Sequence, residues 1–467
     1  MRKFFGWIVL VLGGIGLILG IVLIGSSRTT VDWRRIKAVA FESDDWGLAG
    51  FVPDTMALAG LDRHLLNPGR FPEVYWGSTL EDSATVIRLA DMMVRFRDQD
   101  GLPPVFQANY IMSSFAYEQT GSPTDSAEVS PPAWEWRRYD LPQLPPLYQR
   151  PGMWPAVNSA VARGVWRPEF HGSFHYDPDI RKEAVHQDVT AQFAAERGVL
   201  VFPGASRTWE LGPRRDTADL ATELDRSFEL FENLFGREPT SIIAPDYVWD
   251  GRCEKLWSSR GLNVIQAKRE QRHPRLRGGG WVQRFLKVVE RVAMRFAHPG
   301  RSYLERNCRL EAAQTGDWRQ IADDCRAEIL QAWRRGEPAI VESHRVNYVH
   351  LQPEVAEDGF QAMARLLELL TQDGSEKPLF LTDTEIAQLA RTGTSWCVRG
   401  PYVVVRNYSR SRRMVAVPGV AYVPTAHGII PRISPGAPHL ISIAPASTLL
   451  MPVSLPDQGV GSKAFDP

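Results

Sequence analysis

The sequence contains few cysteines and no excess of charge of either sign. Only four of its 467 residues are cysteine, and no two of them form a C-x-x-C pair. This spacing excludes zinc-ribbon and thioredoxin-like patterns, and it leaves both free thiols and one or two disulfides open. Lysine plus arginine and aspartate plus glutamate are equal at 54 each, so a generally nucleic-acid-binding protein is not expected.

Long uncharged runs are also scarce, with one exception at the N-terminus. Residues 4–25 carry no charged side chain, and about 20 apolar residues suffice to cross a bilayer as a helix. Residues 23–27 make a poor signal-peptidase site. We therefore predict an uncleaved membrane anchor over residues 1–30. The chain would be a single-pass protein of an inner or plasma membrane, with its catalytic part periplasmic or extracellular.

Two short motifs carry residues that could together bind a metal ion. Asp44 and Asp45 follow an apolar run that predicts a buried strand, so they should lie at its carboxyl end. Side chains alternate in direction along an extended segment, so one acid can bind a cation while the other accepts a proton. His171 and His175 have the i,i+4 spacing that places two imidazoles on one side of a helical turn.

Two histidines and one aspartate leave coordination positions open for water, which is typical of a catalytic metal site. Each motif also has a plainer interpretation. An Asp-Asp pair at a strand end is often a helix cap, and paired histidines are often surface or core residues. The combination of both motifs in one chain favours a metal-dependent hydrolase.

Strand-like and helix-like segments alternate along most of the chain, which predicts an α/β fold: a distorted (β/α) barrel of about seven or eight parallel strands over residues 31–391. In such barrels the catalytic residues gather where strands end. From residue 392 to 467, short alternating runs between Gly and Pro clusters predict a small β-sandwich and a tail. The predicted strands are 36–41, 105–112, 165–170, 199–202, 241–244, 263–267, 339–342 and 379–382, and the predicted helices are 83–96, 154–163, 217–235 and 318–333.

Two further predicted strand ends carry candidate site residues. The first continues into Asp246, Tyr247 and Trp249, whose aromatic rings could wall a sugar pocket. The second ends at His344, which could protonate a leaving group. A buried hydrogen-bonding role is the alternative for this histidine. Residues 306–311 are polar enough to form a loop that contacts the substrate.

The order and spacing of these motifs, over residues 36 to 390, resemble the polysaccharide deacetylases of carbohydrate esterase family four and their wider superfamily. The resemblance implies that Asp44 is the catalytic base, and that His344 is the acid. It also implies that the backbone N–H of Tyr247 helps to stabilise an oxyanion. The metal ligands it implies are Asp45, His171 and His175, and the histidine-rich set favours zinc.

The sequence departs from the family pattern at two positions. Ala244 stands where the family has an arginine that orients the base, and Gly172 stands where it usually has Ser or Thr. Arg345, next to His344, is one candidate for the missing guanidinium. These departures indicate a divergent branch.

The favoured function is a membrane-anchored hydrolase that removes N- or O-acetyl groups from a cell-surface or extracellular polysaccharide. A glycan is then the substrate, and exopolysaccharide or cell-envelope machinery is the candidate partner. Ala244 and the extra acid Asp246 keep open a glycoside-bond-cleaving enzyme on the same barrel. A non-catalytic glycan-binding relative is the third interpretation.

Overall fold

The computed structural model describes most of the chain between Thr30 and Val453. Within these limits the residues outside the description are 50, 61–72, 121–132, 200–209, 212–215, 269–299, 315, 373–376, 426 and 435. Residues 1–29 of the predicted anchor 1–30, and most of the predicted strand 199–202, therefore lie outside the described residues.

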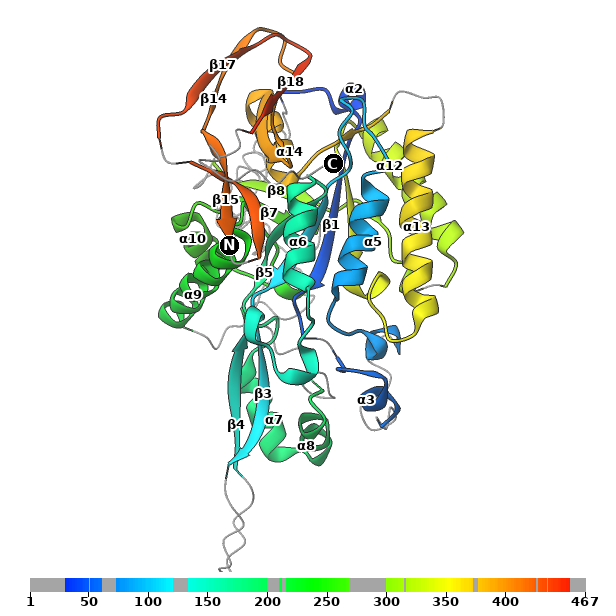
Figure 1. Cartoon of the computed structure of the whole chain (residues 1–467), viewed down its shortest axis with the longest axis vertical. Coiled ribbons are helices and arrows are strands. Elements are labelled where there is room, and N and C mark those ends of the chain that lie inside the picture. Colours follow the sequence, from blue (N-terminus) through cyan, green and yellow to red (C-terminus); the bar gives the residue numbers. More distant parts are fainter. Residues whose placement is uncertain are drawn as a thin grey trace, which may run out of the picture.

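A curled sheet of nine strands forms the centre of the molecule (Figure 1). Every strand pair in it is parallel, as expected where helices connect successive strands. Its strand order is β8-β7-β6-β5-β2-β1-β10-β9, with β11 paired to β1. The strands are β1 (Ala38–Trp46), β2 (Phe106–Ile111), β5 (Trp166–Gly172), β6 (Ser241–Ile242), β7 (Val264–Ala267), β8 (Ser302–Glu305), β9 (Cys308–Arg309), β10 (Ala339–His344) and β11 (Leu379–Phe380).

The sheet is an open half-barrel, which corrects the predicted barrel. The edge strands β8 and β9 do not pair with each other. They are consecutive in the chain, and the link between them crosses the open side. Arg306 N–H donates to Ala267 O on β7, and Asn307 N–H donates to Ile340 O on β10. Residues 306 and 307 thus span the gap that a further pair of strands would close, and this places Arg306 against the interior.

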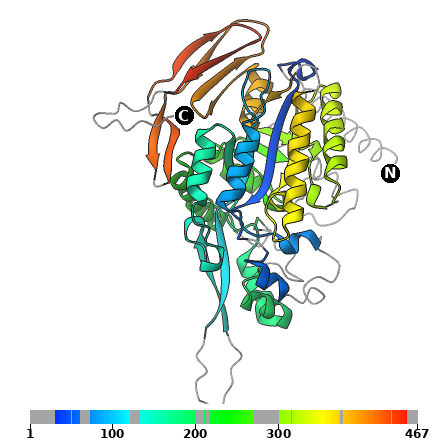
Figure 2. The same ribbon diagram turned by 45° about the vertical axis from the view of Figure 1, so that its right-hand side comes forward.

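Helices cover the outer surface of the sheet and pack against one another in pairs (Figures 1 and 2). The helix α5 packs on α6, and α12 packs on α13. Asp side chains cap the N-termini of α5, α9 and α12, and Gly236 and Gly336 end α9 and α12 in the left-handed region. The described helices of more than five residues in this part are α5 (Ser83–Met93), α6 (Met153–Ala162), α7 (Pro178–Gln187), α8 (Val189–Glu196), α9 (Thr217–Phe235), α10 (Gly251–Ser259), α12 (Trp318–Arg335), α13 (Pro353–Thr371) and α14 (Asp383–Thr392).

A group of smaller elements lies beyond the carboxyl ends of the strands, in the lower part of Figures 1 and 2. It includes the antiparallel hairpin β3 (Ser113–Thr120) and β4 (Ala133–Asp140), the helices α7 and α8, and the short helix α3 (Thr55–Ala59). The short helix α2 (Trp33–Ile36) precedes β1 at the other end. Single 3-10 turns are η1 (Glu73–Gly77), η2 (Leu141–Gln143), η3 (Pro146–Tyr148), η4 (Pro245–Tyr247), η5 (Ala312–Gln314) and η6 (Arg345–Asn347).

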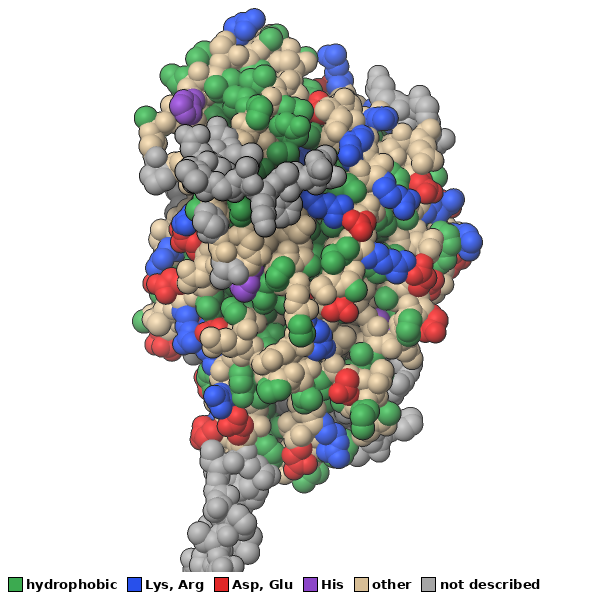
Figure 3. Space-filling view, in the orientation of Figure 1, with side chains coloured by type: hydrophobic (Ala, Val, Ile, Leu, Met, Phe, Trp, Pro, Cys, Tyr) green, Lys and Arg blue, Asp and Glu red, His purple; other side chains and the backbone are tan. Residues whose placement is uncertain are grey.

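The C-terminal part, where a small β-sandwich was predicted, consists of three small antiparallel sheets. It follows α14 directly and lies at the amino end of the central strands (Figure 1). Exposed apolar side chains gather on it (Figure 3), among them Met414, Ile429 and Leu440. The sheets are β12 (Thr394–Arg399), β13 (Tyr402–Asn407) and β18 (Ser447–Pro452); β14 (Arg413–Val417) and β17 (His439–Ile443); and β15 (Val420–Thr425) and β16 (Gly428–Ile433).

The described helices give no support to the predicted membrane-spanning helix. None of the helices in the described residues combines the length and apolar character needed to cross a bilayer. The single-pass topology, and the periplasmic or extracellular location that depended on it, are therefore not retained.

Candidate active site

The three predicted metal ligands meet at the carboxyl ends of β1 and β5. Asp45 Oδ1 lies 3.4 Å from His171 Nε2 and 3.3 Å from His175 Nε2. The three ligand atoms all fall within 4.8 Å of one another. Two ligands about 2.1 Å from a tetrahedral ion are separated by roughly 3.4 Å, so the donor set and its spacing fit a zinc-like ion.

Electrostatics keep Asp45 ionised, and a hydrogen bond orients the ring of His171. Burial alone would raise the pKa of Asp45, but the facing imidazoles of His171 and His175 hold this pKa well below its ordinary value. His171 Nδ1 lies 3.1 Å from Ile243 O. This contact places the Nδ1 proton toward the carbonyl and leaves Nε2 free to face Asp45.

A buried carboxylate shapes the loop that carries His175. Glu210 accepts hydrogen bonds from the backbone N–H groups of Ser173, Phe174 and His175, at 2.9 to 3.0 Å for the shortest contact of each. Gly172 has φ +131°, and a Cβ there would lie 2.6 Å from Glu210 Oε2. The glycine at this position is therefore required by the carboxylate beside it.

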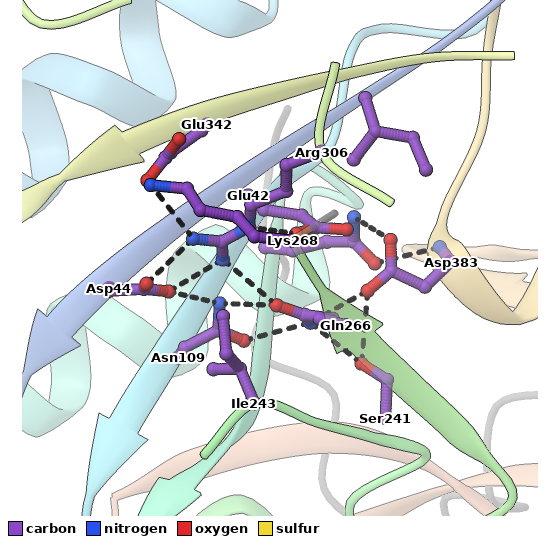
Figure 4. Close-up of polar contacts among 12 residues, drawn as sticks. Glu42, Asp44, Asn109, Ser241, Ile243, Gln266, Lys268, Arg306, Glu342 and Asp383 are labelled. Atoms are coloured by element: carbon purple, nitrogen blue, oxygen red, sulfur yellow. Dashed lines mark hydrogen bonds and ion pairs between the residues drawn. The ribbon is translucent and has the colours of Figure 1, made fainter. Parts of the chain in front are cut away.

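Asp44 is held by a guanidinium that the sequence motifs did not predict. Arg306 Nη1 donates to Asp44 Oδ2 and Nη2 donates to Oδ1, each at 2.7 Å (Figure 4). Asn109 Nδ2 donates to Oδ1 at 2.8 Å. Burial would raise the pKa of Asp44, but Arg306 and then His171 lower it well below the ordinary value. The carboxylate is therefore ionised and fixed in orientation.

Arg345, the predicted source of the missing guanidinium, lies elsewhere. It is fully buried, donates to Leu48 O, and pairs with Glu81 Oε2 at 3.3 Å. No hydrogen bond or ion pair joins it to Asp44. The guanidinium comes instead from Arg306, on the link between β8 and β9.

A buried polar network fixes the plane of Arg306 (Figure 4). Its Nε bonds Glu42, its Nη1 also donates to Tyr247 Oη at 2.8 Å, and its Nη2 donates to Gln266 Oε1 at 3.0 Å. Burial, followed by the nearby charge of Asp383, raises the pKa of Glu42 well above its ordinary value. Every nitrogen of the guanidinium therefore has a partner on a rigid strand or strand end.

His344 lies next to Asp44 and is held by a second carboxylate. The two residues are partners in the register of β1 and β10, and His344 Nε2 lies 3.8 Å from Asp44 Oδ2. His344 Nδ1 contacts Glu311 Oε1 at 2.5 Å, and Asn347 donates to Glu311 Oε2 at 2.8 Å. Burial would lower the pKa of His344, but Glu311 and then Asp44 raise it to about 10.

Of the other predicted site residues, Tyr247 contacts the site through its hydroxyl, whereas Trp249 lies in the core. The backbone N–H of Tyr247 donates to Ala244 O at 3.0 Å, so this donor is already engaged. Its hydroxyl bonds both Arg306 and Glu342. Asp246 is half-buried in the same turn, with φ +53°. Trp249 is fully buried and donates to Glu254, so it lies in the core and not on a pocket wall.

Sequence reasoning missed four residues that define the site: Asn109, Glu210, Arg306 and Glu311. Weak signals existed for three of them. Asn109 is a polar residue inside a predicted buried strand, and Arg306 and Glu311 bound the polar segment 306–311. No pattern in the sequence singled out Glu210.

Two solved structures are similar to this chain at low sequence identity. One is a Mycobacterium smegmatis protein assigned as a polysaccharide deacetylase, with 13% identity, 76% of this chain and 89% of that chain covered, and a TM-score of 0.33. The other is a pseudoenzyme of carbohydrate esterase family four from Bacillus anthracis, with 8% identity, coverage of 76% and 67%, and a TM-score of 0.31. Both matches are divergent, with low sequence identity and low TM-scores. No protein-family model and no curated protein matches the sequence.

Proposed function

We propose that this protein is a metal-dependent hydrolase that removes acetyl groups from a glycan. One observation carries the proposal. Asp44 and His344 are neighbours at the ends of adjacent strands. Arg306 binds Asp44, and Glu311 binds His344. Asp44 and His344 stand beside the triad of Asp45, His171 and His175. A base and an acid thus flank one candidate metal centre, as hydrolysis of an amide or ester requires.

Asp45, His171 and His175 would hold the ion, and zinc suits two imidazoles and one carboxylate. When bound, such an ion lowers the pKa of water and polarises a carbonyl. The chain contributes the positioning, because the buried His171 is anchored to Ile243 O and the His175 loop is anchored to Glu210.

Asp44 would orient the attacking water and accept its proton. Its Oδ1 already accepts from Asn109 and Arg306, whereas Arg306 is the only donor to its Oδ2 among the described residues. A carboxylate oxygen has two acceptor sites, so Oδ2 retains one. That oxygen is also the one closest to His344. The attacking water would therefore donate its hydrogen bond to Asp44 Oδ2.

His344 would donate a proton to the departing amine or alcohol. Its pKa of about 10 keeps the ring positively charged at neutral pH. Glu311 binds Nδ1, so the proton on Nε2 faces the site. After transfer, the Glu311 carboxylate still fixes the orientation of the neutral ring.

The choice of an acetyl group and of a glycan as the substrate rests on the sequence motifs. The test is to purify the full chain, measure bound metal, and follow acetate release from N- and O-acetylated glycans. Stoichiometric zinc with chelator-sensitive acetate release supports the proposal. Metal together with new reducing ends and no acetate would replace it with glycosidic cleavage, and protein that binds no metal would replace it with a binding role.

A further inference from the structure

A pocket lies at the amino end of the central sheet, opposite the candidate active site. It adjoins Trp166 and Arg167 at the start of β5, whereas His171 lies at the other end of that strand. About 430 Å³ of space lies between its atoms, part of it open to solvent. The lining comes both from the central sheet region and from the C-terminal strands, which contribute Arg399 and Gly400.

The pocket is lined by three arginines and, among the described residues, by no acid. Arg167 and Arg237 share one carboxylate, Glu169 Oε1, at 2.7 and 3.2 Å. Glu169 itself is fully buried and also accepts from the backbone N–H groups of Thr240 and Ser241. Two guanidinium groups therefore meet a single carboxylate that lies behind the pocket wall.

The third arginine, Arg399, forms no hydrogen bond to an acidic side chain among the described residues. Arg399 is only 4% exposed, and its two Nη atoms donate to the backbone carbonyls of Phe380 and Pro103. Its buried Nε has no hydrogen-bond partner among the described residues. Two carboxylates whose charges act on Arg399 bind other groups: Glu385 is ion-paired with Arg406, and Asp98 accepts from the backbone N–H groups of Leu102 and Phe380. A buried charged donor without a partner is costly, so an anion in the pocket would stabilise this guanidinium through its charge.

Burial and the excess of positive charge at the pocket lower the pKa of Arg237. Burial, only partly offset by Glu169, lowers the pKa of its guanidinium to about 10, and the neighbouring charge of Arg167 adds to the effect. An anion beside these groups would relieve this repulsion.

We propose that this pocket binds a small tetrahedral oxyanion, phosphate or sulfate, at the junction of the central sheet and the C-terminal strands. Guanidinium groups attract such anions strongly, and three of them line this pocket. Because Arg167 and Arg237 belong to one part and Arg399 to the other, the bound anion ties the two parts together. The ligand therefore stabilises the folded chain.

The test is thermal unfolding of the full chain during titration with sodium phosphate or sodium sulfate, with ionic strength held constant by sodium chloride. Chelator-treated protein and the His175→Ala variant are included, because phosphate could otherwise bind at the metal centre. We expect a saturable rise in Tm that persists in both. Arg237→Gln and Arg399→Gln should lose the rise, whereas Arg432→Gln, an exposed arginine beside the pocket residue Pro431, should keep it.

Isothermal titration of the wild-type chain with phosphate gives a second readout that needs no variant to fold. One saturable site per chain in metal-free protein supports the proposal. A response no larger than that to chloride, a response to acetate alone, or an undiminished rise in a folded Arg237→Gln variant would each overturn it.

Discussion

Arg306 and Asp44, which lie 262 positions apart in the chain, form a two-point ion pair in the interior, with Nη1–Oδ2 and Nη2–Oδ1 distances both of 2.7 Å. Arg306 comes from the link between β8 and β9, and Asp44 from the end of β1. This pair supplies the guanidinium that the sequence motif lacks at Ala244.

Replacing Arg306 by lysine should reduce turnover without removing the metal. A lysine retains the charge but cannot donate two parallel hydrogen bonds, so Asp44 would lose its fixed plane. We expect kcat for acetate release to fall roughly 100-fold, as for small misplacements of a catalytic group. Metal content per chain should stay unchanged. Arg309→Lys, at the exposed residue of strand β9, is the matched control. Equal activity of the two variants would contradict the positioning role.

Asp44 and Asp45 are adjacent but should respond differently to the same substitution. Asp45→Asn removes the charged ligand that faces both histidines, so we expect loss of bound metal. Asp44→Asn should retain stoichiometric metal and lose turnover by at least about 100-fold, because it removes the base. Metal analysis and acetate release on the same preparations separate the two. Retained activity in folded Asp44→Asn protein would refute the assigned base.

Glu311→Gln should change the pH dependence of the reaction. The pKa of His344 is raised to about 10, and the charge of Glu311 is the main cause that raises it. The protonated acid therefore persists as pH rises until that value, and its loss limits activity above it. Without the Glu311 charge the pKa falls toward about 6.5, so the alkaline limb of kcat should move to lower pH by about one unit or more.

The control for this shift is Glu337→Gln, which removes an exposed acid that pairs with Arg335. Its pH profile should match that of the wild-type protein. A Glu311→Gln variant with lower kcat but the same alkaline limb would show that Glu311 only supports the fold.

Glu210→Ala should weaken metal binding although Glu210 is not a proposed ligand. Its carboxylate accepts hydrogen bonds from three successive backbone N–H groups in the loop that contains His175. Groups that orient metal ligands typically contribute about 10- to 100-fold in affinity, so the zinc dissociation constant should rise by that factor. Competition with a chromogenic chelator measures it. Glu232→Gln, on the exposed face of α9, should have no effect.

Local patterns predicted individual elements well. The helical periodicity of residues 217–235 matches α9, and that of 318–333 matches most of α12. The apolar run before Asp44 is indeed a buried strand. These elements are readable because their patterns repeat every few residues and do not depend on distant partners.

Whether the sheet closes into a barrel could not be predicted from such local patterns. The sequence predicted a barrel, but β8 and β9 are short edge strands joined by a crossing link. Whether two edge strands pair depends on the curvature of the whole sheet. No helix in the described residues is suited to cross a membrane, and residues 1–29 of the predicted anchor lie outside them.

The sequence by itself determined the ligand chemistry: an Asp-Asp at the end of an apolar strand and two histidines at close spacing, each confined to a few residues. Only the tertiary structure decided which groups hold the base and the acid. Arg306 replaces the guanidinium expected near residue 244 because the link between β8 and β9 turns its side chain inward. Glu311 reaches His344 because its segment runs beside β10. Such contacts join residues that are distant in the chain, and they arise only when strands from different parts of the sequence pair in one curled sheet.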